Sequence, residues 1–395
     1  MDPKMGGVCQ AIRSSIPALQ QRGVDSEVVS FDDPNEEYIK EDEFVTHALG
    51  PAKGAYSYCA RLHQWMQENL GRFEVVVIDG LWQHHSYGTV RALKYFRQRN
   101  QTAPRLLVMP HGMLDPYFQT AKSRRLKAVR NYLFWKGIEY RVIDAADGLL
   151  FTCRTELELA RQPFRPYRPR NEWSVGFGIQ PPPAFTQLQK EAFFSACPAV
   201  EGKSYILFLG RIDPKKGVDL LVEAYEKLKR EDSLIPDLVV AGPGKDSDYG
   251  KLISASPTSG VHYPGMLQGD AKWGAFYNCE SFILPSHQEN FGIAVVEALA
   301  CSKPVLISDQ VNIYKEIVDA GAGFSAADSL EGTYELLKRW TGLSQQHKQD
   351  MQYHAHRVYK QHFTIDSAAD RLVEVCRKIT STEIHSQTIA YEVSS

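Results

Sequence analysis

The sequence has no CxxC pair, no excess of charge of one sign and no long apolar run. Its seven cysteines are scattered and odd in number, which argues against a disulfide framework and a zinc site and favours a reducing cytosol. A net charge of −2 gives no reason to expect nucleic-acid binding. No apolar run approaches the roughly 20 residues of a membrane span. The start, MDPKMGGVCQ, lacks the apolar core of a signal peptide. We therefore expect a cytoplasmic protein.

The alternation of short apolar runs with longer helical patterns predicts the fold class. With 395 residues, the chain is too long for one core, so two domains are expected. Continuous apolar strands separated by helices indicate parallel sheets that are covered on both faces. We predict an α/β protein with two doubly wound, Rossmann-like domains. The predicted strands are 27–31, 73–80, 105–110, 148–152 and 172–177, followed by 205–210, 237–244, 261–265, 281–285 and 303–308.

Proline-rich segments mark the boundary between the domains. Proline removes backbone donors and resists both helix and sheet, and GIQPPPAF (178–185) is one of the two densest such segments. We predict a first domain over 1–178, a hinge over 179–185 and a second domain over 186–379. A terminal helix of the second domain is free to pack back on the first. The polar residues 380–395 are predicted to be a disordered tail.

The N-terminus departs from the usual pattern of a doubly wound domain, in which a strand precedes the first glycine turn. Here only MDPKM comes before Gly6 and Gly7, and a helical pattern follows at once. The first N-terminal strand is therefore apparently missing. Two explanations stay open. Either the start is assigned too late and Met1 is an internal residue, which we favour, or the domain truly lacks a strand.

Two cations follow the predicted strand 205–210. Arg211 and Lys216 come between that strand and a helix that begins near Gly217, at the edge where open α/β sheets bind ligands. Arginine offers a planar fork and lysine a mobile point charge, so the pair suits a diphosphate beside a helix N-terminus. The alternative is a solvated basic loop.

Two carboxylates lie eight residues apart in SHQENFGIAVVEALA (286–300). Glu289 precedes a predicted helix and Glu297 lies two turns into it, so about 12 Å separates them. That is too far to share a proton, but it suits an elongated ligand such as a sugar nucleotide, whose vicinal hydroxyls donate to carboxylates. The alternatives are a buried Glu297 paired with a structural Arg or Lys, and an exposed Glu289.

The order of six short segments has the pattern of a known family. They are GGV (6–8), PHG (110–112), GRIDPKKG (210–217), AGPG (241–244), PSHQENFGIAVVEALA (285–300) and KPVLISD (303–309). Together they resemble the retaining GT-B glycosyltransferases of family 4 (group 1).

The resemblance implies roles for individual residues. Arg211 and Lys216, after Gly210, resemble the diphosphate pair, and Glu297 resembles the ribose-binding glutamate. Glu289 resembles the group that holds the donor sugar. The resemblance also assigns the backbone of Asn290, Phe291 and Gly292 to the donor sugar, Gly7 to the phosphate or acceptor, and His111 to a place near the donor sugar. It implies no metal and no cofactor, and it makes the nucleotide sugar a substrate.

Three residues at the predicted strand ends of the first domain are further candidates. His111 follows the strand 105–110 directly, and its alternative is a purely structural histidine. Trp82 and His84 follow the strand 73–80 on the same edge, where they are candidates for an acceptor cleft. Ordinary packing is the alternative for both.

A basic segment with aromatic residues suggests peripheral membrane contact through 122–135. Basic amphipathic helices bind anionic membrane surfaces. The alternative is a solvated basic face with a buried aromatic stripe. The residues concerned are Lys122, Arg124, Arg125, Lys127 and Arg130, with Tyr132, Phe134 and Trp135.

These observations lead to one functional prediction. We expect a hexosyltransferase (EC 2.4) that moves a sugar, with retention, from a UDP- or GDP-sugar to a hydroxyl of a glycan or lipid-linked saccharide. Exopolysaccharide or cell-surface polysaccharide synthesis is the expected setting, in the cytoplasm or at the inner face of the membrane. A UDP-sugar epimerase on the same scaffold and an inactive nucleotide-sugar-binding protein remain alternatives.

Overall fold

The computed structural model describes residues 1, 7–121, 124–255, 259–380 and 387–393. The chain divides into two compact units, Met1–Gly178 with Ile365–Ser395, and Ile179–Thr364. The first boundary lies next to the predicted hinge 179–185. The second boundary assigns the helix Ile365–Thr380 to the first unit. The sequence had left a terminal helix free to pack back on the first domain.

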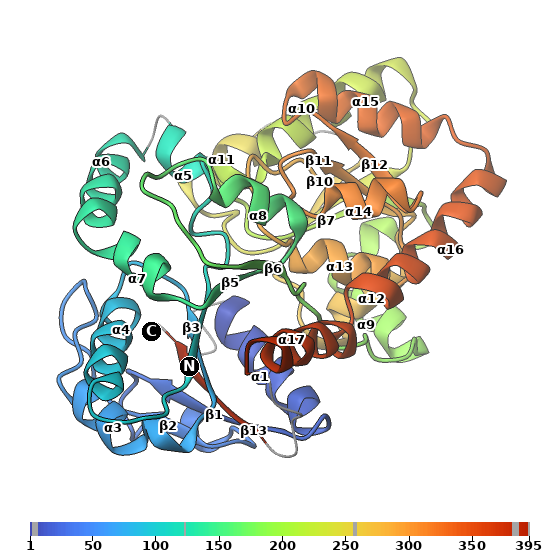
Figure 1. Cartoon of the computed structure of the whole chain (residues 1–395). Coiled ribbons are helices and arrows are strands. Elements are labelled where there is room, and N and C mark those ends of the chain that lie inside the picture. The colour runs from blue at the N-terminus through green and yellow to red at the C-terminus, as the bar shows by residue number, and fades with distance from the viewer. Residues whose placement is uncertain (2–6, 122–123, 256–258, 381–386, 394–395) are drawn as a thin grey trace. The chain divides into compact units, whose positions relative to one another are not determined.

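The first unit is built on a parallel sheet of seven strands in the order β2-β1-β13-β3-β4-β5-β6 (Figure 1). The strands are β1 (Val24–Ser30), β2 (Thr46–Ala48), β3 (Val75–Asp79), β4 (Arg105–Met109), β5 (Gly148–Phe151), β6 (Glu172–Ser174) and β13 (Gln387–Val393).

Strand β13 corrects the prediction for the C-terminal segment. The prediction of a disordered tail over 380–395 is wrong for Gln387–Val393, which pairs in parallel with β1 on one side and β3 on the other. A doubly wound sheet places the strand that precedes its first helix at this position. Residues from the C-terminal part of the chain thus occupy this position between β1 and β3. Two parallel strands with unpaired inner edges supply the ladder of donors and acceptors that binds it. Residues 381–386, 394–395 and Gly6 lie outside the described part.

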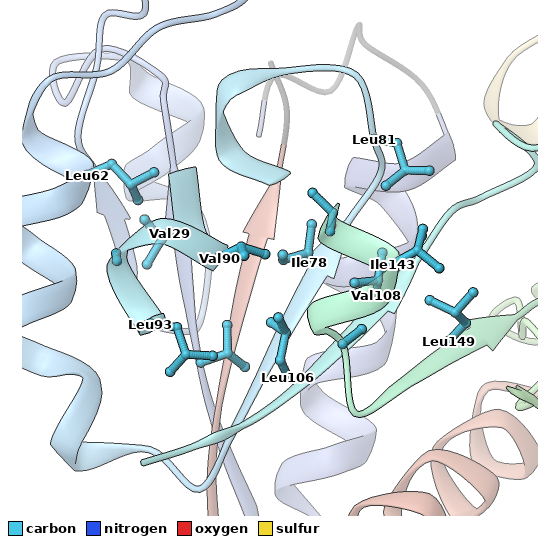
Figure 2. Close-up of a cluster of buried hydrophobic side chains, with 14 of the residues drawn as sticks. Val29, Leu62, Ile78, Leu81, Val90, Leu93, Leu106, Val108, Ile143 and Leu149 are labelled. Carbon is cyan, nitrogen blue, oxygen red and sulfur yellow. The ribbon is translucent and has the colours of Figure 1, made fainter. Parts of the chain in front are cut away.

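Helices cover both faces of this sheet. One buried cluster joins β3 and β4 to α3, α4 and α7, and includes Leu62, Leu93 and Ile143 (Figure 2). A second joins the opposite face to α1 and α17 through Ile16 and Val373. The helices are α1 (Gly7–Gln20), α2 (Glu37–Lys40), α3 (Arg61–Asn69), α4 (His84–Arg97), α5 (Tyr117–Thr120), α6 (Arg125–Phe134), α7 (Tyr140–Ala145), α8 (Arg154–Ala160) and α17 (Ile365–Thr380).

The second unit has a parallel sheet of six strands in the order β12-β11-β10-β7-β8-β9. The strands are β7 (Tyr205–Leu209), β8 (Asp237–Ala241), β9 (Val261–Gly265), β10 (Ser281–Leu284), β11 (Val305–Ser308) and β12 (Gly323–Ala326). The helices are α9 (Gln187–Ala196), α10 (Val218–Glu231), α11 (Asp248–Ser254), α12 (Gly269–Asn278), α13 (Ile293–Ala300), α14 (Tyr314–Asp319), α15 (Leu330–Thr341) and α16 (Gln345–His362).

Each of the ten predicted strands overlaps an observed one, and two doubly wound α/β units are confirmed. Among the residues that the structure describes, the strands that the sequence did not reveal are short or lie in polar segments, namely β2, β12 and β13. Within the described ranges, no helix combines the length and apolar character needed to cross a bilayer.

Candidate functional site

In the second unit, the loops after β7, β10 and β11 meet because these strands are neighbours in a parallel sheet. The carbonyl of Lys215 accepts from Ser286 Oγ at 2.9 Å and from the N–H of His287 at 2.8 Å. Ser308 Oγ in turn donates to the carbonyl of Ser286 at 2.5 Å. All three loops are thereby fixed to one another at the carboxyl edge of the sheet, where such folds bind ligands.

Gly217 allows the basic loop to approach the β10 loop this closely. Its φ is +65° at the start of α10, and a Cβ there would overlap the carbonyl oxygen of Pro285. Only glycine combines this left-handed backbone with no side chain. The sequence KKG therefore holds Lys216 directly against the loop that carries Glu289.

Lys216 and Glu289 form an ion pair, and both side chains are about four-fifths buried, with 18% and 19% exposed. The backbone of Glu289 is also held. Its N–H donates to the carbonyl of Gln310 and its carbonyl accepts from the N–H of Asn312, both at 2.9 Å. Because the backbone of Glu289 is held at both its N–H and its carbonyl group, its carboxylate orients the ammonium of Lys216 at the edge of the sheet.

Arg211 differs from Lys216 in being unengaged. Its side chain is exposed, and among the described residues it makes no hydrogen bond or ion pair. The predicted pair thus consists of one oriented ammonium and one guanidinium that is free to bind an anion. Arginine forks bind phosphate oxygens in pairs of hydrogen bonds.

Glu297 lies on α13, and its carboxylate accepts from Lys272 Nζ of α12 at 2.5 Å. Burial raises the pKa of Glu297, and the charge of Lys272 and its hydrogen bond oppose the rise. The lysine partner that was left open for a buried Glu297 is therefore present. It sets the carboxylate in place without excluding a hydroxyl ligand, because a carboxylate has several acceptor positions.

The residues between the two glutamates lead into α13. Gly292 is the N-cap, with φ +75°. The ring of Phe291 is buried and makes an edge contact with Phe363, with ring centres 5.8 Å apart. Asn312 Nδ2 donates to Asn290 Oδ1 at 3.3 Å. Because these side chains are held, what the segment offers a ligand is the first turn of the helix, whose N–H groups have no intrahelical acceptor.

In the first unit, His111 occupies the end of β4 with a left-handed backbone, φ +50°. Its Nε2 lies 2.7 Å from Asp79 Oδ1 at the end of the neighbouring β3. Burial raises the pKa of Asp79, and the hydrogen bond and charge of His111 oppose the rise. Left-handed residues other than glycine cost about 1–3 kcal/mol and cluster at functional sites. Because Nε2 is engaged with the carboxyl group of Asp79, Nδ1 is the ring nitrogen that is left for a ligand.

A small cavity of about 40 Å³ adjoins His111 and Asp79. Helix α1 contributes to its wall, and Gly7 is the first residue of that helix. The remaining lining residues are Ala11, Ile12, Ser15, Leu19, Met109, Val175, Gly176, Phe177, Gly178, Ala368, Ala369 and Leu372.

Trp82 and His84 have different surroundings. The Trp82 ring packs among aromatic rings, with its centre 5.4 Å from that of Phe164. His84 lines a pocket of about 350 Å³ to which Trp82 does not contribute. His84 Nδ1 accepts from the N–H of Cys59 at 3.2 Å, which places the proton of the neutral ring on Nε2. Burial and then the charge of Arg91 lower the pKa of His84, so the ring is neutral near pH 7.

Aromatic side chains line the pocket beside His84, and the charge in its lining is the positive charge of Arg91. Three tyrosines and Arg91 provide flat faces and donors, a combination that suits a sugar ring with an anionic group. Its lining residues are Tyr56, Tyr58, Cys59, Ala60, Leu62, His63, His84, Tyr87, Gly88, Arg91 and Ile138.

A buried carboxyl, that of Glu139, binds Trp82 and helix α4, which carries His84. Glu139 Oε1 accepts from the N–H of Trp82 at 3.0 Å and from Ser86 Oγ at 2.8 Å. Burial raises the pKa of Glu139 to about 7, against the opposing effect of these two hydrogen bonds. A carboxyl that is easier to protonate in the folded state stabilises the fold fully below its unfolded pKa of about 4.5, and that stabilisation is lost as the pH rises through about 7.

We therefore expect Glu139→Gln to flatten the pH dependence of the free energy of unfolding. At about 1.4 kcal/mol per pKa unit, the wild type should lose about 3 kcal/mol between these limits relative to the variant. Urea denaturation across this pH range measures it. Glu158→Gln, at an acid of α8 whose side chain is 41% exposed, is the control and should keep the wild-type slope. If Glu139→Gln lost as much free energy of unfolding as the wild type over this pH range, Glu139 would not be the source of the pH dependence.

Sequence reasoning missed the partners of the predicted residues. Lys272 has no fixed spacing to Glu297, so nothing in the sequence pairs them. Asp79 was detectable, since it ends a predicted strand on the same edge as His111. Glu156, which accepts from the N–H of Gly112 at 2.5 Å and of Thr152 at 2.7 Å, gave no signal.

Within the described ranges, no group of three or more His, Cys, Asp or Glu side chains is placed to hold a metal ion. The absence of a metal requirement stays a prediction.

Two family models match the chain, one in each half. Residues 6–172 match the glycosyl transferase 4-like domain and residues 189–349 match glycosyl transferases group 1. Together they cover both the His111 strand end and the loops that carry Lys216 and Glu289.

Named relatives match over part of their length. A D-inositol 3-phosphate glycosyltransferase of Arthrobacter sp. is 32% identical over 34% of this chain and 35% of its own. An N,N'-diacetylbacillosaminyl-diphospho-undecaprenol α-1,3-N-acetylgalactosaminyltransferase of Campylobacter jejuni is 27% identical over 36% of this chain and 37% of its own. The match thus spans about a third of the length of these relatives.

A solved structure is similar over nearly the whole chain. The crystal structure of HepE from Anabaena in complex with UDP-glucose has a TM-score of 0.69 at 14% identity, and the match covers 94% of this chain and 96% of that one. This likeness shows the GT-B fold.

Proposed function

From the two glycosyl transferase models that match the chain, one over 6–172 and one over 189–349, we propose that it transfers a glycosyl group from a UDP- or GDP-sugar to a hydroxyl. The observation that carries the proposal is the pairing of Lys216 with Glu289 at the carboxyl edge of the second sheet. Arg211 is free in the same loop.

In the proposed donor site, Arg211 and Lys216 bind the diphosphate, and Glu297 accepts from the ribose hydroxyls. Glu289 holds the sugar hydroxyls together with the backbone of Asn290, Phe291 and Gly292. Gly210 begins the loop. A diphosphate would compete with Glu289 for the ammonium of Lys216, so binding of the donor frees that carboxylate for the sugar. In the first unit, the roles that the resemblance implies for His111 and Gly7 stay proposals: His111 for the donor sugar, and Gly7 for the phosphate or acceptor.

The proposed reaction breaks the bond between the anomeric carbon and the phosphate oxygen and forms a bond from that carbon to the acceptor oxygen. Negative charge grows on the departing nucleoside diphosphate, and its leaving oxygen takes up the proton that the acceptor hydroxyl loses. Oriented cations at that oxygen are the largest stabilising effect that the described residues offer. We propose retention of configuration, with attack on the face from which the leaving group departs, and no metal.

For the acceptor, we propose a glycan or a lipid-linked saccharide, in exopolysaccharide or cell-surface polysaccharide synthesis at the cytoplasmic side of the membrane. The His84 pocket, with its tyrosines and Arg91, suits a sugar next to a phosphate. The Campylobacter relative is named for an acceptor of this kind, a saccharide on diphospho-undecaprenol. Trp82 would act only by supporting the pocket, since its ring is packed.

The test is thermal stabilisation of the full chain by UDP, GDP, ADP and their sugars. A ligand present at 100 times its Kd stabilises the folded state by about 2.7 kcal/mol, which corresponds to a rise in Tm of several degrees for units of this size. We expect one nucleotide base to raise Tm selectively and Glu297→Ala to lose most of that rise.

Glu280→Ala is the matched control. Glu280 also forms an ion pair with a lysine of the second unit, Lys348 Nζ at 2.9 Å, but it lies at the opposite end of β10 from the proposed site. This variant should keep the nucleotide response. No response to any nucleotide, or an equal response in Glu297→Ala, would refute the donor site. Conversion of the donor without an acceptor would indicate an epimerase, and binding without turnover an inactive binding protein.

A further inference from the structure

Helix α6 exposes apolar side chains that no other part of its unit covers. Leu126, Val129 and Leu133 are 88%, 60% and 66% exposed. The helix lies at the periphery of the first unit, between α5 and α7 (Figure 1). Isolated exposed leucines are common on proteins, but a contiguous apolar group on one helix marks an interaction site.

The three residues form one stripe. At about 100° of rotation per residue, they fall within about 60° of one another around the helix axis. The opposite side of the same helix carries Ala128, which is buried, and ends at Trp135, which is completely buried. The helix therefore already packs against its unit through one face, and the stripe is a second apolar face turned to solvent.

Basic residues flank the stripe on both sides. By the same rotation, Arg125 lies on one side of it and Lys127 and Arg130 on the other, and Lys136 follows one turn beyond Tyr132. All four basic side chains are exposed. The segment 116–138 contains six basic and no acidic residues, in a chain whose net charge is −2. Lys122, which was also predicted to take part, lies outside the described residues.

We propose that this face of α6, with Leu126, Val129 and Leu133 as the inserting residues, docks on an anionic membrane surface. An interfacial helix buries its apolar stripe about 5–10 Å into the boundary between headgroups and acyl chains. The flanking cations then lie at the level of the anionic headgroups, each contributing attraction. Trp135, predicted earlier as part of the contact, is instead the anchor that holds the helix to its unit.

The arrangement of charge favours a membrane over a second copy of this chain. A two-fold symmetric contact places the same patch against itself. It would set the four cations of one copy against the four of the other, with no acid in the segment to separate them, and like charges across an interface are costly. A sheet of anionic lipid offers the complementary charge on both sides of the stripe.

The same stretch of chain also reaches the pocket beside His84. Ile138 lines that pocket, and the ring of Phe134 contacts that of Tyr56, with centres 5.6 Å apart. A helix docked on the membrane would thus hold the pocket near the headgroup region, where the saccharide of a lipid-linked acceptor resides. This consequence rests on the proposed function, whereas the docking itself does not.

The test is flotation of the full chain with phosphatidylcholine vesicles that contain or lack phosphatidylglycerol. We expect binding only to the anionic vesicles, and weaker binding as salt screens the headgroups. The double variant Leu126→Glu, Leu133→Glu should lower the vesicle partition coefficient about tenfold or more, because it places charge where the helix inserts. Lys127→Gln with Arg130→Gln should lower it on anionic vesicles by a comparable factor.

Matched controls separate this face from the rest of the surface. Leu234 is 89% exposed in the second unit, so Leu234→Glu should bind as the wild type does, and so should Lys251→Gln at another exposed lysine. Unchanged binding by the Leu126/Leu133 variant would overturn the proposal, as would equal binding to neutral vesicles. A concentration-dependent dimer that this variant abolishes, without vesicle binding by the wild type, would assign the face to a second copy. Vesicle binding and dimerisation can both be measured whether or not the chain transfers a sugar.

Discussion

Turnover should fall about 10²-fold or more when Lys216 is replaced by alanine, with a smaller change in KM for the donor. The ammonium is oriented by Glu289 and would act on charge that develops on the leaving oxygen. Loss of one preorganised group of this kind costs about 10²–10³ in turnover. Arg211→Ala should have an effect of similar size. Initial rates with the nucleotide-sugar identified by thermal stabilisation would measure both.

Lys215→Ala provides the matched control. It removes the same charge one residue away, and it keeps the backbone carbonyl to which Ser286 and His287 donate. Its turnover should stay within a few-fold of the wild type. A rate near that of the wild type in Lys216→Ala or Arg211→Ala would remove the diphosphate pair from the mechanism. An equal loss in all three variants would indicate general electrostatic attraction by the loop.

The strand ends were predictable because a parallel sheet imposes a strong sequence pattern. A strand buried on both faces must be a continuous apolar run, so YILFL and SFIL were visible, and with them the edge where Lys216 and Glu289 lie. The resemblance to a family then gave roles to residues that spacing alone left open.

The partners of these residues were not predictable in the same way. Lys272 reaches Glu297 from a different helix, and the sequence separation between them has no period that a helix or strand would impose. Strand β13 was missed because its short run lies within a polar tail and depends on pairing with β1 and β3. Around α6, the sequence pointed to the aromatic residues, but tertiary packing buries Trp135 and leaves Leu126 and Leu133 exposed.

Gly217→Ala should be among the most damaging single substitutions in the second unit. A Cβ there overlaps the carbonyl oxygen of Pro285 and stands on a left-handed backbone. The backbone costs about 1–2 kcal/mol and the overlap about 1–3 kcal/mol more, so unfolding should become easier by about 2–5 kcal/mol. Urea denaturation would measure it.

The same substitution should also impair transfer, because Gly217 follows Lys216 directly. A shift of about 1 Å in a positioned group can cost 10²-fold in rate, so folded Gly217→Ala should turn over about as slowly as Lys216→Ala. Gly202→Ala is the control, since Gly202 has φ +73° but no atom within 4 Å of the added Cβ. Gly202→Ala should lose only the stability that the left-handed backbone costs, and its turnover should stay that of the wild type. If both glycine variants lost the same stability and kept their rates, the close approach at Pro285 would have no part in positioning Lys216.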